Sequence, residues 1–217
     1  MTSPIANDPI RIAEELACCA ADLDERDQEL QLALLRLLAQ GEPVEPARLA
    51  GAVGVPAAVA TESLRRWHEV QADDDGRIVA FGGLSIVEAP HRLRVGGRTL
   101  HAWCAWDTLF LPELIGSPAE VESRCPVTGR LISLRVDRGG PSELTPPEAV
   151  VSFLLPGTAY AGDVIAGFCR FVHFFVSPTA AETWTAEHPG TFVISIADGF
   201  EVGRITNAAQ FGQALAR

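Results

Sequence analysis

The sequence contains no lysine, so all 17 of its basic residues are arginine. Without lysine the chain cannot form a Schiff base, cannot build a lysine-bearing phosphate loop and cannot use a Ser-Lys dyad. It also lacks the dinucleotide loop G-x-G-x-x-G, the nucleophile elbow G-x-S-x-G, the zinc motif H-E-x-x-H and paired C-x-x-C motifs. These absences exclude the most common catalytic chemistries and leave the cysteines to be explained.

Long apolar runs and positive charge are scarce as well. No run of about 20 apolar residues could cross a membrane, and residues 1–30 lack the apolar centre of an export signal. The formal net charge of −11 disfavours binding to nucleic acid or to an anionic membrane, because both require positive charge. We therefore expect a cytoplasmic protein that binds neither nucleic acid nor membrane.

Five cysteines are present: Cys18, Cys19, Cys104, Cys125 and Cys169. An odd number in a chain without an export signal argues against a disulfide framework. In a reducing compartment these residues are free thiols, available for catalysis or for binding soft metals.

Residues 1–81 are predicted to form a small helical domain. Apolar residues recur at helical spacing over residues 27–40, and two further helices are predicted over residues 46–53 and 55–70. An aspartate-rich turn and a short strand at residues 77–81 follow. Three helices followed by a hairpin is the order of a winged-helix domain.

A winged-helix domain can bind DNA through its third helix, or it can serve as a scaffold. The third predicted helix offers only Arg65 and Arg66, beside Glu62, and three aspartates at residues 73–75 would repel phosphates. We therefore favour the scaffold. The alternative is a winged-helix transcriptional regulator that senses metal through its cysteines.

Residues 82–217 are predicted to form an α+β domain, with flanking helices around a mixed or antiparallel sheet. Short extended segments alternate with turns, such as the glycine pair at residues 96–97. The pattern also predicts a helix over residues 100–111, ended or kinked by Pro112, and a strand over residues 167–176.

The segment HAWCAWDTLFLP, residues 101–112, places a thiol near a carboxyl group. On a helix, Cys104 and Asp107 are three residues apart and share a face. Near a helix start the macrodipole would favour the thiolate of Cys104. The spacing also fits a structural cysteine beside a surface aspartate, or a zinc or copper site that adds His101 or His173.

The segment GFCRFVHFFV, residues 167–176, contains a second cysteine in aromatic surroundings. On a strand, Cys169 shares a face with Phe171, and Arg170 points the opposite way. A cysteine in such a strand is usually part of the core, so this segment alone does not indicate catalysis.

Together, these segments resemble the organomercurial (alkylmercury) lyase family. The strings that carry the resemblance are AWCAWDTLFLPELIG, SRCPVTG and FCRFVHFF, followed by SPTA and a tryptophan. It covers roughly residues 80–200, and the leading helical part suits the family by its shape. One departure is Arg170, where well-known members place a second cysteine directly after the one equivalent to Cys169.

The resemblance implies that Cys104 and Cys169 bind mercury and that Asp107 handles the proton while the carbon–mercury bond is broken. The products would be a hydrocarbon and Hg(II). It further implies that the enzyme needs no organic cofactor and that Hg(II) leaves to small external thiols or to mercuric reductase.

The other three cysteines are not expected to take part in the reaction. Cys125 matches a third family cysteine and is expected to be structural. The adjacent Cys18 and Cys19 lie outside the resemblance, and they are either an incidental pair or a spare mercury scavenger.

This chemistry agrees with general principles. Soft thiolates are the ligands that select soft metals, and a second thiolate weakens the bond from mercury to carbon. The departing carbon needs a proton, which calls for a positioned general acid. An apolar pocket, expected to be lined by Trp103, Trp106 or Phe171, would raise the pKa of Asp107 toward neutrality.

Overall fold

The computed structural model describes residues 8–17, 23–155 and 164–216, and it confirms the predicted α+β class. The described strands form an eight-stranded and a three-stranded sheet, and the paired strands in both sheets are antiparallel. Among the described helices, none combines the length and the apolar character that a membrane crossing requires.

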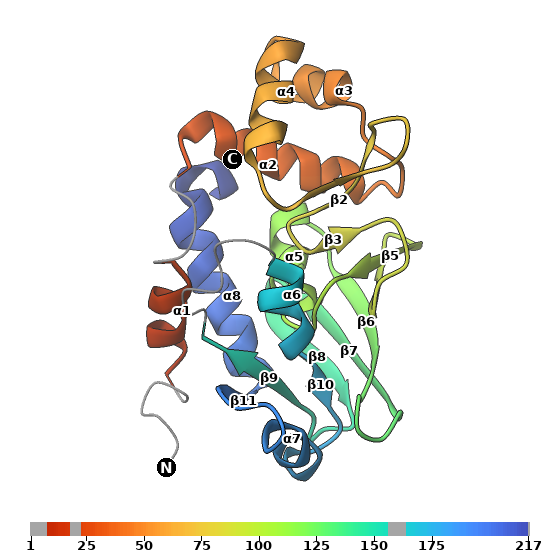
Figure 1. Cartoon of the computed structure of the whole chain (residues 1–217), viewed down its shortest axis with the longest axis vertical. Coiled ribbons are helices and arrows are strands. Elements are labelled where there is room, and N and C mark those ends of the chain that lie inside the picture. Colours follow the sequence, from red (N-terminus) through yellow and green to blue (C-terminus); the bar gives the residue numbers. More distant parts are fainter. Residues whose placement is uncertain (1–7, 18–22, 156–163, 217) are drawn as a thin grey trace.

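Three helices lie at one end of the molecule (Figure 1). They are α2 (Glu25–Leu38), α3 (Pro46–Val53) and α4 (Ala57–Arg66), in agreement with the sequence prediction. The side chain of Asp24 caps α2 by accepting a hydrogen bond from a backbone N–H of the first turn. A proline in its first turn begins α3, and Gly54, at a φ of 76°, ends it.

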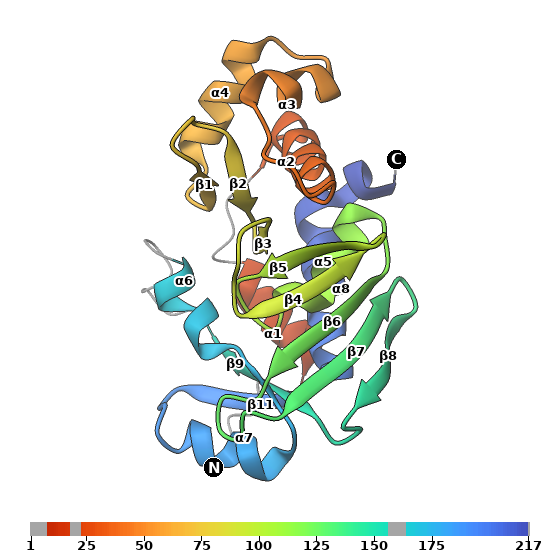
Figure 2. The same cartoon turned by 90° about the vertical axis from the view of Figure 1, so that its right-hand side faces the viewer.

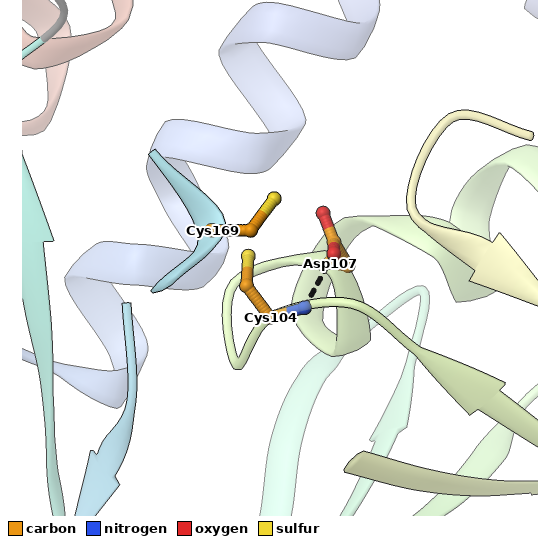
Figure 3. Close-up of side chains that lie close together, drawn as sticks. All are labelled: Cys104, Asp107 and Cys169. Atoms are coloured by element: carbon orange, nitrogen blue, oxygen red, sulfur yellow. Dashed lines mark hydrogen bonds between the residues drawn. The ribbon is translucent and has the colours of Figure 1, made fainter. Parts of the chain in front are cut away.

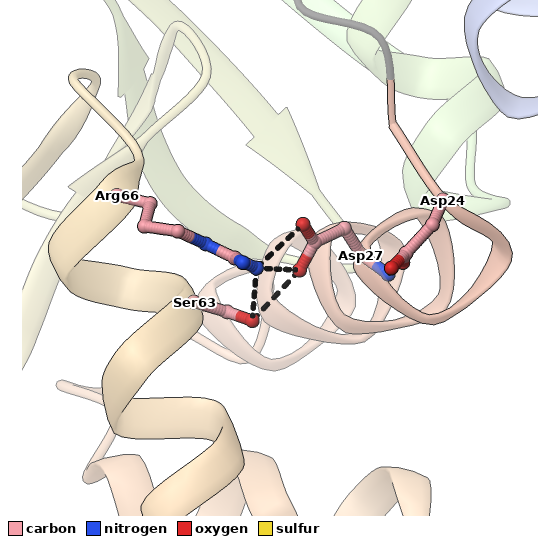
Figure 4. A network of polar contacts seen from close by, with 4 residues as sticks. All are labelled: Asp24, Asp27, Ser63 and Arg66. Carbon is pink, nitrogen blue, oxygen red and sulfur yellow. Dashed lines mark hydrogen bonds and ion pairs between the residues drawn. The ribbon is translucent and has the colours of Figure 1, made fainter.

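A polar network joins α4 to α2 (Figure 4). The carboxylate of Asp27 accepts a hydrogen bond of 2.7 Å from the Ser63 hydroxyl and forms an ion pair of 2.8 Å with Arg66. Charge-assisted bonds of this kind fix orientation as well as adding energy. The network holds α4 against α2 and neutralises the charge of Arg66.

The larger sheet has the strand order β1-β2-β3-β5-β4-β6-β7-β8 (Figure 2). Its strands are β1 (Val70–Ala72), β2 (Ile78–Phe81), β3 (Leu84–Ser85), β4 (His91–Val95), β5 (Arg98–Ala102), β6 (Ala119–Arg124), β7 (Leu131–Asp137) and β8 (Gly140–Thr145). Buried and more exposed residues alternate along β4, β6 and β7, so one face of the sheet is packed and the other meets solvent. Because β1 and β2 belong to this sheet, it continues from the N-terminal helices into the rest of the chain.

The smaller sheet lies at the opposite end of the molecule from α3 (Figure 1). It has the order β10-β9-β11, with β9 (Val150–Leu154) between β10 (Phe174–Phe175) and β11 (Thr191–Ser195). Between β9 and β10 the chain forms α6 (Val164–Gly167) and the 3-10 helix η2 (Cys169–Phe171). Helix α7 (Pro178–Thr185) follows β10, and the side chain of Ser177 caps its start.

Three further helices support the site. The long helix α8 (Ile196–Phe211) is followed by the short 3-10 helix η3 (Gly212–Ala216). Helix α1 (Pro9–Ala17), which is absent from the elements predicted above, packs along α8. Its buried residues belong to the same core cluster as the smaller sheet. Helix α5 (Asp107–Ile115) joins the two cores, because its Leu109 lies in that cluster while Leu111, Leu114 and Ile115 lie in a second cluster with α2, α3 and α4.

Candidate active site

Three side chains that the sequence predicted to act together meet in the interior (Figure 3). The sulfur atoms of Cys104 and Cys169 and a carboxylate oxygen of Asp107 all lie within 4.8 Å of one another. All three residues are buried, and among the described residues they form the only group of cysteine, histidine and acidic side chains with this spacing.

The local structure around Cys104 differs from the predicted helix over residues 100–111. The first residues of this segment belong to strand β5, because Ala102 pairs with both Leu84 and His91. Helix α5 starts only at Asp107. Nor does Pro112 end the helix, since it lies inside α5. Cys104 therefore lies in the short turn between a strand and a helix.

A hydrogen bond brings the carboxyl group back over this turn. The backbone N–H of Cys104 donates to Oδ2 of Asp107 at 2.7 Å (Figure 3). Asp107 is the first residue of α5, so this bond closes the turn that leads into the helix and satisfies a buried backbone N–H. The Cys-x-x-Asp spacing thus acts through a hydrogen-bonded turn before the helix and not through a shared helix face.

Cys169 also lies outside the secondary structure predicted for it. The segment over residues 167–176 was expected to be one strand, but only Phe174 and Phe175 pair with β9. Cys169 begins a 3-10 turn that Val172 closes by donating its N–H to the Cys169 carbonyl. Aromatic and β-branched composition favours a strand only where a neighbouring strand is free to pair.

Two contacts fix the position of the Cys169 turn. The hydroxyl of Ser152 on β9 donates to the Phe171 carbonyl at 2.8 Å. The backbone N–H of Ala105 donates to the Val172 carbonyl at 3.1 Å, which ties the Cys104 turn directly to the Cys169 turn. The two thiols are thus held together by backbone hydrogen bonds between segments that are far apart in the sequence.

The environment of Asp107 favours its protonated form. Burial raises the pKa of this carboxyl group and the charge of Glu69 raises it further, while hydrogen bonds from Cys104 and from the Trp103 backbone oppose the shift. The result is a pKa of about 7, compared with about 3.9 for an unperturbed aspartate. A carboxyl group with this pKa can both accept and donate a proton near neutral pH.

Both thiols are protonated in the free protein. Burial raises the pKa of Cys104 well above its usual value, and its hydrogen bond to Cys169 raises it further. The same hydrogen bond lowers the pKa of Cys169, but burial and the charges of Asp107 and Glu69 outweigh it, so this pKa is also raised. The expected stabilisation of a Cys104 thiolate by the macrodipole is therefore wrong, because desolvation is the larger effect.

A cavity of about 390 Å³ is lined by Asp107 and Cys169, while Cys104 lies behind its wall and is not among the lining residues. As predicted, Trp103 and Trp106 line it, but Phe171 does not, and Phe168 of the same segment is among the other aromatic residues in its wall. Phe171 instead packs edge-on against His188, because the 3-10 turn rotates it away from the strand position. The aromatic walls make one side of the cavity suitable for an apolar group.

Glu69, which follows α4, is a site residue that the sequence analysis missed. It lines the same cavity as Asp107 and Cys169, and no hydrogen bond or ion pair of its side chain occurs within the described part of the chain. Burial raises its pKa, against a smaller opposing effect of His68. No motif marks Glu69, because its place near the site depends on how the N-terminal helices pack on the sheet.

Replacing Glu69 with glutamine is expected to lower the pKa of Asp107 from about 7, because it removes a negative charge that raises this pKa. The protonated fraction of Asp107 at neutral pH would fall accordingly. Carbon-13 NMR titration of the Asp107 carboxyl group measures the midpoint in both proteins. In the control Glu62→Gln, which removes an exposed carboxylate from α4, the midpoint should stay in place. A midpoint that is unchanged or raised in Glu69→Gln would contradict the electrostatic role of this residue.

The remaining candidates lie away from the three residues. His101 contacts the Ala89 carbonyl and His173 the Arg170 carbonyl, so the structure contradicts a zinc or copper site that adds either histidine to the cluster. Cys125 is buried in its own turn, where burial raises its pKa but hydrogen bonds led by that from Thr128 lower it overall. Its structural role stays a prediction. Cys18 and Cys19 lie outside the described residues.

Comparisons with known proteins agree with this geometry. The family model described as alkylmercury lyase matches residues 84–207. The alkylmercury lyase of Staphylococcus epidermidis is 40% identical over 171 residues, which are 79% of this chain and 78% of the relative. That of Pseudomonas putida is 37% identical over 195 residues, 90% of each chain.

A solved structure has a fold similar to that of this chain. The crystal structure of the mercury-bound form of MerB2 has a TM-score of 0.77 and 24% sequence identity, and the match covers 92% of this chain and 98% of the other. The family model spans more than half of the chain, and the relatives named above cover most of it. This chain therefore belongs to the alkylmercury lyase family.

Proposed function

We propose that this chain cleaves the carbon–mercury bond of organomercurials by protonolysis, with Cys104 and Cys169 as mercury ligands and Asp107 as the proton carrier. The observation that supports this most strongly is the meeting of two thiols and one carboxyl group, all buried, within 4.8 Å. Two thiols alone would suffice to hold mercury. The carboxyl group, with a pKa of about 7, supplies the proton chemistry that cleavage requires.

The steps balance as follows. One thiol displaces the ligand that the organomercurial carries, and its proton leaves with that ligand. When the second thiol binds mercury it loses its proton to the ionised form of Asp107, which is present near neutral pH because its pKa is about 7; a metal-bound thiol is deprotonated. The electron pair of the carbon–mercury bond then stays with the carbon, which takes the proton from Asp107 and leaves as a hydrocarbon. Hg(II) remains bound to Cys104 and Cys169.

The aromatic cavity receives the organic group in this proposal. Trp103, Trp106 and Phe168 offer apolar surface beside the thiols, and about 390 Å³ is enough for a phenyl or alkyl group. No organic cofactor is needed, since mercury is part of the substrate. Small external thiols, or mercuric reductase, take up the Hg(II) and return the two cysteines to their thiol form.

Release of benzene from phenylmercury tests this function. With excess small thiol we expect many turnovers per chain, because the thiol removes Hg(II) from Cys104 and Cys169. Without thiol we expect benzene release to stop at one equivalent, with mercury retained by the protein. Gas chromatography of benzene, with mercury measured on the same samples, gives both quantities. Failure to release benzene above the protein-free rate in excess thiol would contradict the proposed activity.

We further propose that residues 1–81 form a winged-helix-like unit that supports the catalytic part, residues 82–217, and does not bind DNA. Ion pairs engage three of its seven arginines within the described residues: Arg48 contacts Glu42, and Arg66 contacts Asp27 and Arg77 contacts Asp73 at 2.8 Å in each case. Few charges therefore remain for phosphates. The family match does not support the transcriptional regulator. Leu35 of α2 and Trp67 line the cavity, so this unit would also shield the site from water. We also propose that the protein is located in the cytoplasm.

A further inference from the structure

A two-residue turn between β2 and β3 touches the carboxyl group of Asp107. Phe81 and Leu84 are paired, so Gly82 and Gly83 alone connect the strands. Their φ angles are 54° and 90°, and positive values at both positions are what a type I′ hairpin turn requires. Glycine adopts them without steric cost.

At Gly83 the absence of a side chain matters for a second reason. A Cβ atom there would lie 2.5 Å from Cγ of Asp107, 2.6 Å from Oδ1 and 2.9 Å from Oδ2. Real Cβ atoms essentially never approach other heavy atoms within 3.0 Å. The carboxyl group therefore occupies the space that any other residue at position 83 would fill.

Hydrogen bonds hold both partners in this contact. The carbonyl of buried Gly83 accepts a bond of 3.0 Å from the N–H of Trp103, and the Cys104 N–H donates to Asp107 at 2.7 Å. Neither the turn nor the carboxyl group can move away without losing a buried hydrogen bond.

We infer that Gly83 is a positioning residue for the acid: the space left by its missing side chain sets where the Asp107 carboxyl group lies relative to the two sulfur atoms. The inference rests on the function proposed above. It assigns a role in the reaction to a residue of the β2–β3 turn, which makes no contribution of its own to mercury binding or proton transfer.

Gly83→Ala is expected to push the carboxyl group off the Cys104 N–H and away from the leaving carbon. A misplacement of about 1 Å can slow a reaction by about 10²-fold, so single-turnover release of benzene should slow by about that factor. Mercury binding should persist at one equivalent per chain, because neither thiol is displaced. A general loss of structure would instead reduce both quantities together.

Gly82→Ala is the matched control. It places the same methyl group at the neighbouring position with positive φ, but there its Cβ would meet only Leu35 Cδ2, at 3.8 Å. Both variants carry backbone strain, and only Gly83→Ala collides with the acid. Release by Gly82→Ala should therefore stay close to that of the unmodified protein. Equal rates in the two variants would overturn the inference.

Combination with Asp107→Asn separates the inference from the proposed function. If Gly83 acts through Asp107, adding Gly83→Ala to Asp107→Asn should cause little further loss, whereas independent effects would multiply. A further loss of about 10²-fold would overturn the inference. Normal release by Asp107→Asn alone would instead contradict the proposed role of Asp107.

Thermal unfolding keeps the inference testable should Gly83→Ala fold poorly. In an Asp107→Ala background the colliding carboxyl group is gone, so Gly83→Ala should lower the midpoint no more than Gly82→Ala does. If Gly83→Ala remains clearly the more damaging of the two in that background, the contact with Asp107 is not the cause and the inference is wrong.

Discussion

Replacing Cys169 with serine is expected to reduce benzene release from phenylmercury to the protein-free rate, and Cys104→Ser should do the same. A hydroxyl group is a hard, weakly acidic ligand with little affinity for mercury, whereas a thiolate is a soft one. With one thiol left, the protein could capture the organomercurial but could not weaken its bond to carbon. Both serine variants should remain folded, because serine is slightly smaller than cysteine and can hydrogen-bond to the remaining thiol.

Multiple-turnover assays in excess thiol, with circular dichroism to confirm folding, measure this effect. The double variant Cys18→Ser with Cys19→Ser is the control, since these cysteines lie outside both family-like segments, and its activity should change little. Near-normal cleavage by folded Cys169→Ser would mean that one thiol suffices, and the two-thiolate mechanism would be wrong.

The sequence predicted much of the fold because periodicity and turn residues are local signals. The helices α2, α3 and α4 follow from apolar spacing, proline and glycine. The class of the fold follows from the change of pattern after about residue 80. Pairing between distant strands is not a local signal. Such pairing explains why residues 98–102 form a strand and why β10 contains only Phe174 and Phe175.

The composition of the site could be predicted, but its geometry could not. The resemblance brought Cys104, Asp107 and Cys169 together, and the structure places them within 4.8 Å. The link between the Cys104 turn and the Cys169 turn, and the contact with Gly83, depend on hydrogen bonds between segments that lie far apart in the chain. The protonated state of the two thiols could not be predicted either, because it depends on their burial, which outweighs the helix dipole.

Replacing Asp107 with asparagine is expected to leave mercury binding intact and to slow hydrocarbon release by roughly 10²- to 10⁴-fold, the usual contribution of a general acid. The amide oxygen of asparagine can still accept the hydrogen bond from the Cys104 N–H, so the turn should keep its shape. What the variant loses is a group that titrates near pH 7 and can carry the thiol proton to the carbon.

The decisive measurement is single-turnover benzene release by Asp107→Asn, loaded with one equivalent of phenylmercury and with no external thiol present. We expect one equivalent of mercury to stay bound to Cys104 and Cys169 while benzene appears at least about 10²-fold more slowly than from the unmodified protein. Normal binding with normal release would show that the proton comes from a thiol or from water. Loss of binding together with release would show that Asp107 is a mercury ligand or a support for the site, and either result would contradict its role as the proton carrier.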